Sequence, residues 1–166
     1  MVDVLMHKLS FSGITDVEFG ETGNLLAVAD EDGSVYILES ESLNQNQTFQ
    51  VSGFINRLCW VESDSIILVG CKTGYIHLIK LKENKNEIIF PDLSSTDHLS
   101  PITCIASSPR ALMIGGHANG TISIKTKYNV IPYVYQAHHG PITAMQANEE
   151  LLFSGDSFGI LRIWEL

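Results

Sequence analysis

Residues 14–38 read ITDVEFGETGNLLAVADEDGSVYIL, which is three apolar runs separated by turn residues. Apolar and polar residues alternate in the first and third runs, as is typical of strands with one buried side. Asp32 and Gly33 come before the third run. This pair predicts a type I′ hairpin, because both residues tolerate the positive φ that the turn requires. The stretch and its continuation therefore predict four short strands, at residues 14–19, 25–29, 34–38 and 48–51.

The same plan returns three more times along the chain. An anchor isoleucine is followed three residues later by a second apolar residue, and 17 to 19 residues later by a turn glycine. The anchors are Ile14, Ile55, Ile102 and Ile142, and their partners are Val17, Leu58, Ile105 and Met145. The anchors are 41, 47 and 40 residues apart. A period near forty with several strands in each unit is typical of a β-propeller, in which one unit forms one blade.

We therefore predict an all-β fold of about four four-stranded antiparallel blades in a single domain, residues 1–166. The repeats are predicted at about 9–50, 51–97, 98–137 and 138–166. Inner strands are expected at 102–106 and 142–147, and outer strands at 87–90 and 131–135. Residues 2–8 are predicted as a spare strand that completes another blade.

Two histidines stand four residues before an anchor, His98 and His138, and the last repeat closes with residues 161–165, LRIWE. In these features the chain resembles the WD-repeat β-propellers. The resemblance implies a brace inside each blade, made by a His, a Ser or Thr, a turn Asp and a Trp. We assign the turn position to Asp32, Thr73, Asn119 and Phe158, and on that assignment no repeat carries the full set.

Four repeats are few for this family, and an open arc would expose apolar blade surfaces and unpaired strand edges at both ends. We therefore expect a half-propeller or partial ring that is completed by a second copy, another chain or a further part of a longer protein. A closed ring of four blades is the alternative.

Composition indicates a folded protein, because 45% of the residues are apolar and 17% are charged. The net charge of −9 argues against direct nucleic-acid binding. We expect no membrane span, since no apolar run approaches the ~20 residues that one needs. Three cysteines, Cys59, Cys71 and Cys104, lie in apolar runs, which predicts reduced thiols in an intracellular protein of the cytoplasm or nucleus.

Residues with catalytic or metal-binding chemistry form no recognisable motif. His98, His117, His138 and His139 lack a metal-ligand spacing, and bracing accounts for two of them. Residues 70–74, GCKTG, lack the upstream glycine of a phosphate-binding loop. We expect no enzymatic activity, no metal and no cofactor.

Surface recognition is the function that this inventory leaves. The hairpin turns and the loops before the inner strands should gather on one surface of the propeller. The candidate partner-binding residues there are Phe11, Asp30, Glu31, Asp32, Phe54, His117, Asp156 and Phe158. We predict a scaffold or adaptor for protein–protein interactions in a complex. The alternatives are a reader of basic or modified peptides, using the acidic and aromatic residues, and a catalytic or metal-binding propeller.

Overall fold

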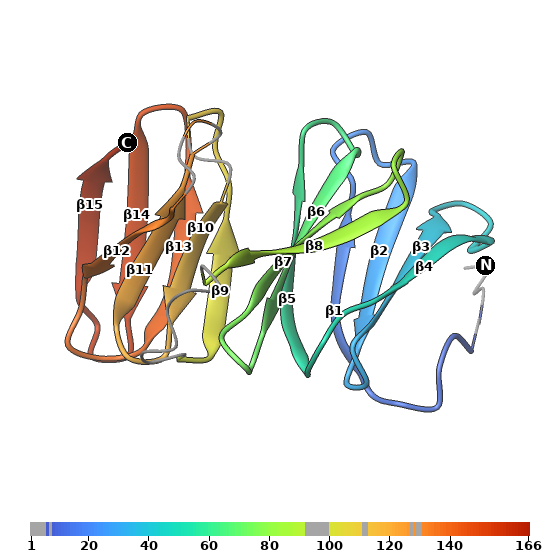
Figure 1. Cartoon of the computed structure of the whole chain (residues 1–166), viewed down its shortest axis with the longest axis horizontal. Helices are drawn as coiled ribbons and strands as arrows, with labels where there is room; N and C mark the ends of the chain where they lie inside the picture. The colour runs from blue at the N-terminus through green and yellow to red at the C-terminus, as the bar shows by residue number, and fades with distance from the viewer. Residues whose placement is uncertain (1–5, 7, 92–99, 111–112, 127, 129–130) are drawn as a thin grey trace, which may run out of the picture.

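The computed structural model describes residues 6, 8–91, 100–110, 113–126, 128 and 131–166. Within these residues the chain forms fifteen strands in four antiparallel sheets. Each sheet is built from strands that are consecutive in sequence, and the sheets follow one another along the longest axis of the molecule (Figure 1). The predicted all-β fold of propeller blades is confirmed. In the described part of the chain, no helix is long and apolar enough to cross a membrane.

We number the sheets as blades 1 to 4. Blade 1 contains β1 (Ile14–Phe19), β2 (Leu25–Asp30), β3 (Ser34–Glu39) and β4 (Gln45–Gln50). Blade 2 contains β5 (Ile55–Val61), β6 (Ile66–Cys71), β7 (Ile76–Lys80) and β8 (Lys85–Phe90). Blade 3 contains β9 (Ile102–Ala106), β10 (Met113–His117), β11 (Thr121–Lys125) and β12 (Tyr133–Gln136). Blade 4 contains β13 (Ile142–Ala147), β14 (Leu151–Asp156) and β15 (Leu161–Glu165), and has three strands among the described residues.

The inner strands lie where the anchor isoleucines predict them, and β1, β9 and β13 have the predicted bounds. The outer strand of blade 1 begins earlier than predicted, at Gln45 rather than residue 48. Its first residues are polar and give no apolar signal, yet they pair with β3 through the backbone. The predicted strand at residues 2–8 falls almost wholly outside the described residues.

The predicted type I′ turn at Asp32 and Gly33 is wrong, although the hairpin itself is present. Gly33 has a positive φ of 86°, whereas Asp32 does not. The last ladder pair before the turn is Ala29 with Val35, so the connection is longer than two residues. The Asp30 carboxylate accepts from the backbone N–H of Asp32 at 3.0 Å and holds this longer turn.

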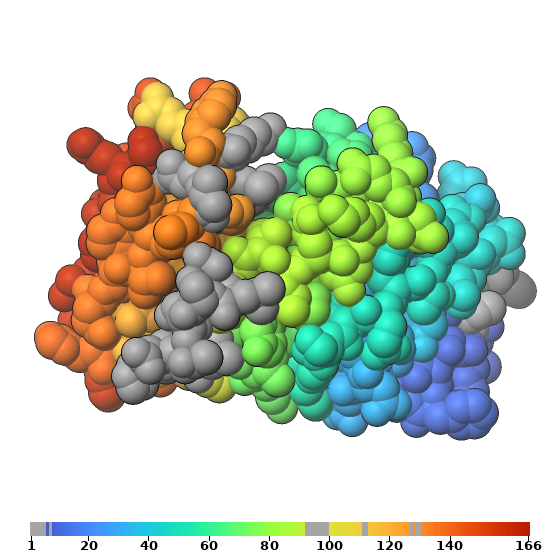
Figure 2. Space-filling model, in the orientation of Figure 1, coloured from blue at the N-terminus to red at the C-terminus, as the bar shows by residue number. Residues whose placement is uncertain are grey.

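Adjacent blades pack face to face, and Figure 2 shows them as one continuous elongated body. We call the side of a blade that faces the next blade its front, and the side that faces the preceding blade its back. Between blades 1 and 2 the core includes Ala27, Ala29, Val35 and Ile37 from the front and Ile55, Leu58 and Trp60 from the back. The same arrangement buries Leu68, Ile76, Leu78, Ile102 and Met113 between blades 2 and 3. Between blades 3 and 4 it buries Cys104, Ile122, Ile142 and Leu152.

The arc is open. Blades 1 and 4 lie at opposite ends of the molecule, and the described residues place no blade at the back of blade 1 or the front of blade 4 (Figure 1). Exposed apolar side chains on these two terminal sides include Ile14, Val17, Phe19, Leu161 and Ile163. The prediction of a partial ring is confirmed, since burial of apolar side chains between blades stops at both ends of the arc.

Candidate interaction surface

In each blade, the last residue of the second strand is buried and carries a side chain that can hydrogen-bond or titrate. It stands three residues before each turn glycine and is occupied by Asp30, Cys71, His117 and Asp156. The turn member of the brace was predicted two residues later, and that prediction is wrong. Those later residues, Asp32, Thr73, Asn119 and Phe158, are exposed at the hairpin turns. The second strand ends with its side chain directed into the blade, whereas the turn residue points to solvent.

Blade 4 contains a complete brace, contrary to the prediction that no repeat carries the full set. His138 Nδ1 lies 3.1 Å from Asp156 Oδ2, and His138 Nε2 lies 2.7 Å from Ser154 Oγ. Trp164 Nε1 donates to the same Ser154 oxygen at 2.8 Å. Because a carboxylate only accepts and an indole N–H only donates, a neutral His138 ring gives the chain a single direction. Trp164 donates to Ser154, Ser154 donates to His138 Nε2, and His138 Nδ1 donates to Asp156.

The brace of blade 1 is built around Asp30 instead. Its carboxylate accepts from the backbone N–H groups of Asp32 and Ser34, at 3.0 and 2.9 Å, and from the Tyr36 hydroxyl at 3.1 Å. Burial by itself raises the pKa of this carboxyl, but these bonds and one from Ser10 outweigh it and hold the pKa below its usual value. Hydrogen bonds likewise lower the pKa of Asp156 against the opposing effect of burial. Both carboxylates are structural anions.

Blades 2 and 3 carry other groups at this position. Burial raises the pKa of the Cys71 thiol to about 12, which keeps it protonated and unreactive. His117 Nε2 lies 2.9 Å from the Ser123 hydroxyl, and Nδ1 lies 3.2 Å from the Ser100 carbonyl oxygen. Burial lowers the pKa of His117 and keeps the ring neutral. Cys71 and His117 are therefore buried structural groups inside their blades.

The hairpin turns and the loops before the inner strands lie together, as predicted for a propeller. In each blade, the backbone N–H of the residue after the brace position donates to a carbonyl oxygen of the loop that precedes the inner strand. The four bonds, each 2.9 Å long, join Glu31 to Gly13, Lys72 to Phe54, Ala118 to Pro101 and Ser157 to Pro141. The result is one turn-bearing edge, at the bottom of Figure 1, which we call the turn face.

The predicted site residues divide into two groups. Phe11, Glu31, Asp32 and Phe158 are exposed, and Phe54 is half-buried beneath Lys72, whose Nζ lies 3.5 Å from the ring centroid. Asp30, His117 and Asp156 are buried. The exposed acidic residues Glu31 and Asp32 lie on blade 1 and Phe158 lies on blade 4, at opposite ends of the arc (Figure 1). One chain therefore does not bring Phe158 together with the acidic turn of blade 1.

Of the candidate histidines, His117 and His138 are buried and hydrogen-bonded, whereas His139 is exposed. His138 lies in the bracing position that the sequence analysis gave it, whereas His98 lies outside the described residues. Among the residues with a described placement, no group of three or more His, Cys, Asp or Glu side chains could hold a metal ion.

A family model described as WD domain, G-beta repeat matches residues 4–38. The WD-repeat prediction is confirmed. Two curated proteins with significant similarity are both named target of rapamycin complex subunit LST8. The mouse protein is 29% identical over 102 residues, which is 56% of this chain and 31% of the relative. The bovine protein is 30% identical over 90 residues, or 51% of this chain and 28% of the relative. The matched part of this chain thus spans about a third of their length.

Two solved structures share the fold of this chain, and both are computationally designed β-propellers. The Ika4 protein has a TM-score of 0.84 at 19% identity, with 100% of this chain and 99% of that chain covered. The Ika8 protein has a TM-score of 0.78 at 19% identity, with 92% of this chain and 46% of that chain covered. At this identity the likeness concerns the fold alone.

Proposed function

We propose that this chain is a non-enzymatic scaffold that holds protein partners together in a complex. The names of the curated relatives support this class, because each is a subunit of the target of rapamycin complex. The structural use of the buried acids, thiol and imidazoles also supports it, since these groups are not presented to a substrate. The proposal places the chain inside the cell, where its three free cysteines stay reduced.

The observation that carries the proposal is the exposed aromatic ring on the turn face of blade 4. Phe158 is 71% exposed, at the turn position where the other blades have Asp32, Thr73 and Asn119. An apolar ring gains nothing from water, so a polar residue would serve a solvent-exposed turn better. This ring is available to a partner.

Phe158 is also held in place before any partner arrives. Its backbone N–H donates to Asp156 Oδ1 at 3.0 Å, so the buried brace fixes the turn. A Cβ atom added to Gly140 would lie 2.7 Å from two carbon atoms of the ring, which shows that the ring lies directly over this glycine. An aromatic anchor that is ordered in advance binds with a small loss of conformational entropy.

The test is to express the tagged chain in its own cells and quantify the proteins that purify with it in stoichiometric amounts. We expect the variant Phe158→Ser to lower recovery of a direct partner by about 30-fold, as for an interface hot spot of ~2 kcal/mol. Tyr128→Ser is the matched control, because Tyr128 is 93% exposed and lies on blade 3. Equal recovery with Phe158→Ser, or a native complex that contains no other protein, would contradict the proposal.

A further inference from the structure

A small residue stands at the same front position of every blade, at Ala29, Gly70, Gly116 and Gly155. Its function is clearest in blade 2, where Gly70 is buried. A Cβ atom on Gly70 would lie 2.6 Å from Ile102 Cγ2 and 2.6 Å from Ile105 Cδ1. The bare backbone of this glycine therefore receives the anchor isoleucine and its +3 partner from the back of the next blade.

Blade 3 repeats the contact, and blade 4 leaves it empty. A Cβ atom on Gly116 would lie 3.0 Å from Ile142 Cγ2 and 3.2 Å from Met145 Cε, again the anchor and its +3 partner. The equivalent glycine of blade 4 is Gly155, and a Cβ atom there would meet no heavy atom within 4 Å. The front of blade 4 thus has the receiving surface without an anchor to fill it.

The anchor pair that this surface would receive lies at the other end of the same chain. Ile14 and Val17 on the back of blade 1 are 49% and 51% exposed. Their equivalents in blade 2, Ile55 and Leu58, are 0% and 5% exposed because blade 1 covers them. One chain therefore has one unfilled receiving surface and one uncovered anchor pair.

Hydrogen bonds cross between blades beside the anchors Ile102 and Ile142. Asn56 Nδ2 on blade 2 donates to the carbonyl oxygen of Ile102 on blade 3 at 2.7 Å. Thr103 Oγ1 on blade 3 lies 2.5 Å from the carbonyl oxygen of Ile142 on blade 4. In both cases a polar side chain one residue after an anchor reaches the backbone of the next anchor.

Thr143 is the equivalent residue of blade 4. The Thr103 hydroxyl lies within hydrogen-bonding distance of two carbonyl oxygens, that of Gly116 at 3.0 Å and that of the next anchor. The Thr143 hydroxyl contacts the carbonyl oxygen of Gly155 at 3.4 Å. By analogy with Thr103, the carbonyl oxygen of Ile14 on a following blade 1 would be the second acceptor for Thr143.

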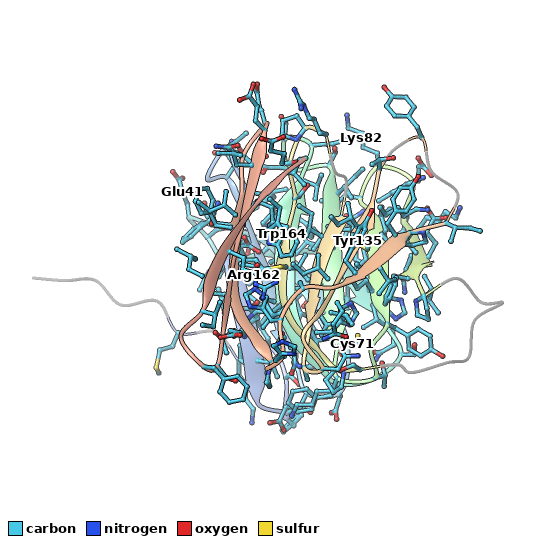
Figure 3. All side chains as sticks on the ribbon, turned by 90° about the vertical axis from the view of Figure 1, so that its left-hand side faces the viewer. Glu41, Cys71, Lys82, Tyr135, Arg162 and Trp164 are labelled. Carbon is cyan, nitrogen blue, oxygen red and sulfur yellow. The ribbon has the colours of Figure 1, made fainter. Side chains whose placement is uncertain are left out.

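The apolar side chains around Gly155 are also exposed where their equivalents in blade 2 are buried. Leu161 and Ile163 on the front of blade 4 occupy the ladder positions of Ile76 and Leu78 on the front of blade 2. The blade 2 pair is 0% and 3% exposed, whereas Leu161 and Ile163 are 68% and 60% exposed. Figure 3 looks onto this end of the arc, where no further blade covers the strands of blade 4.

We infer that a second copy of this chain completes the propeller, with the front of blade 4 of each copy packed on the back of blade 1 of the other. Two arcs of four sheets would form one ring of eight blades, the upper end of the usual range. An arc of this shape also forms about half of a longer designed propeller, since this chain covers 46% of the Ika8 protein with a TM-score of 0.78. The inference concerns the terminal sides only, and holds whether or not the turn face binds a partner.

The test measures the native mass of the purified chain by sedimentation at several concentrations. We expect a dimer of about 37 kDa, twice the chain mass of 18.3 kDa. The variant Gly155→Arg should halve the mass to that of a monomer, and the variant Ile14→Asp should do the same from the other side. Both positions are open in the single chain, so far-UV circular dichroism should be unchanged. Tyr128→Ser, on blade 3, is the control and should remain dimeric.

Mixing the two variants tests the direction of the contact. Gly155→Arg keeps an intact back and Ile14→Asp keeps an intact front, so the mixture should recover one front-to-back contact and form a one-to-one dimer. A dimer that survives Gly155→Arg alone would show back-to-back association and overturn the inference. A folded wild-type monomer, or an assembly of more than two copies, would also overturn it.

Discussion

Replacing Ser154 by alanine should destabilise the chain more than a loss of one hydroxyl group suggests. The Ser154 side chain is fully buried and joins two groups, accepting from Trp164 Nε1 at 2.8 Å and donating to His138 Nε2 at 2.7 Å. The variant leaves a buried ring nitrogen and an indole N–H without this partner. A buried polar group left unpaired costs ~1–3 kcal/mol, and Trp164 is half-buried, so we expect a total loss of about 2–4 kcal/mol.

Urea unfolding followed by tryptophan fluorescence measures this loss, at one fixed chain concentration because association would change the apparent stability. Ser157→Ala removes the same hydroxyl group three residues away, at an exposed turn, and should change the free energy of unfolding by less than about 0.5 kcal/mol. A loss below about 0.5 kcal/mol for Ser154→Ala would refute the reasoning that the four-residue brace stabilises blade 4.

Two further predictions concern blades 1 and 3. Burial, with a smaller contribution from Asp16, raises the pKa of Glu18 to about 7 from 4.5, so the folded chain holds this proton more tightly than the unfolded chain. The stabilisation that protonated Glu18 gives the folded chain is complete below pH 4.5 and is lost as the pH rises toward 7. The variant Glu18→Gln should therefore raise the urea midpoint at pH 8 but not at pH 4. The same change in midpoint at both pH values would contradict this prediction. Gly120→Ala should cost more than about 2 kcal/mol, since φ is +82° and the new Cβ would lie 2.2 Å from a backbone oxygen. The matched variant is Gly23→Ala, where φ is +77° and the space around the new Cβ is open, so only the backbone strain of ~1 kcal/mol remains. Equal thermal melting temperatures for the Gly120→Ala and Gly23→Ala variants would argue against a steric clash at Gly120.

The blades could be predicted from the sequence because their signals are local. An anchor such as Ile102 starts an alternating run, and a glycine such as Gly120 ends the next hairpin, so inner strands were placed to the residue. Outer strands depend on pairing with a neighbour more than on their own residues, and the start of β4 was accordingly missed.

The brace could not be placed from the sequence because two candidate residues compete in the first repeat. Asp30 and Asp32 flank one glutamate, and only the end of β2 shows that Asp30 points into the blade. A signal for the position was present, since a glycine directly precedes it in three repeats, at Gly70, Gly116 and Gly155. The contact that Gly70 and Gly116 make with the next blade is a long-range property, which no single repeat contains.

The two sides of each blade are different surfaces, and this gives the chain a polarity. A self-complementary surface pairs with one copy of itself and stops, whereas a front and a back can continue to add copies in one direction. The number of copies in a closed assembly is then set by the angle through which each blade turns relative to the last. A substitution at an interior contact such as Gly116 and Ile142 would alter that angle without touching either terminal side. A change in that angle favours a head-to-tail filament over a closed ring, so the contacts between blades are determinants of stoichiometry.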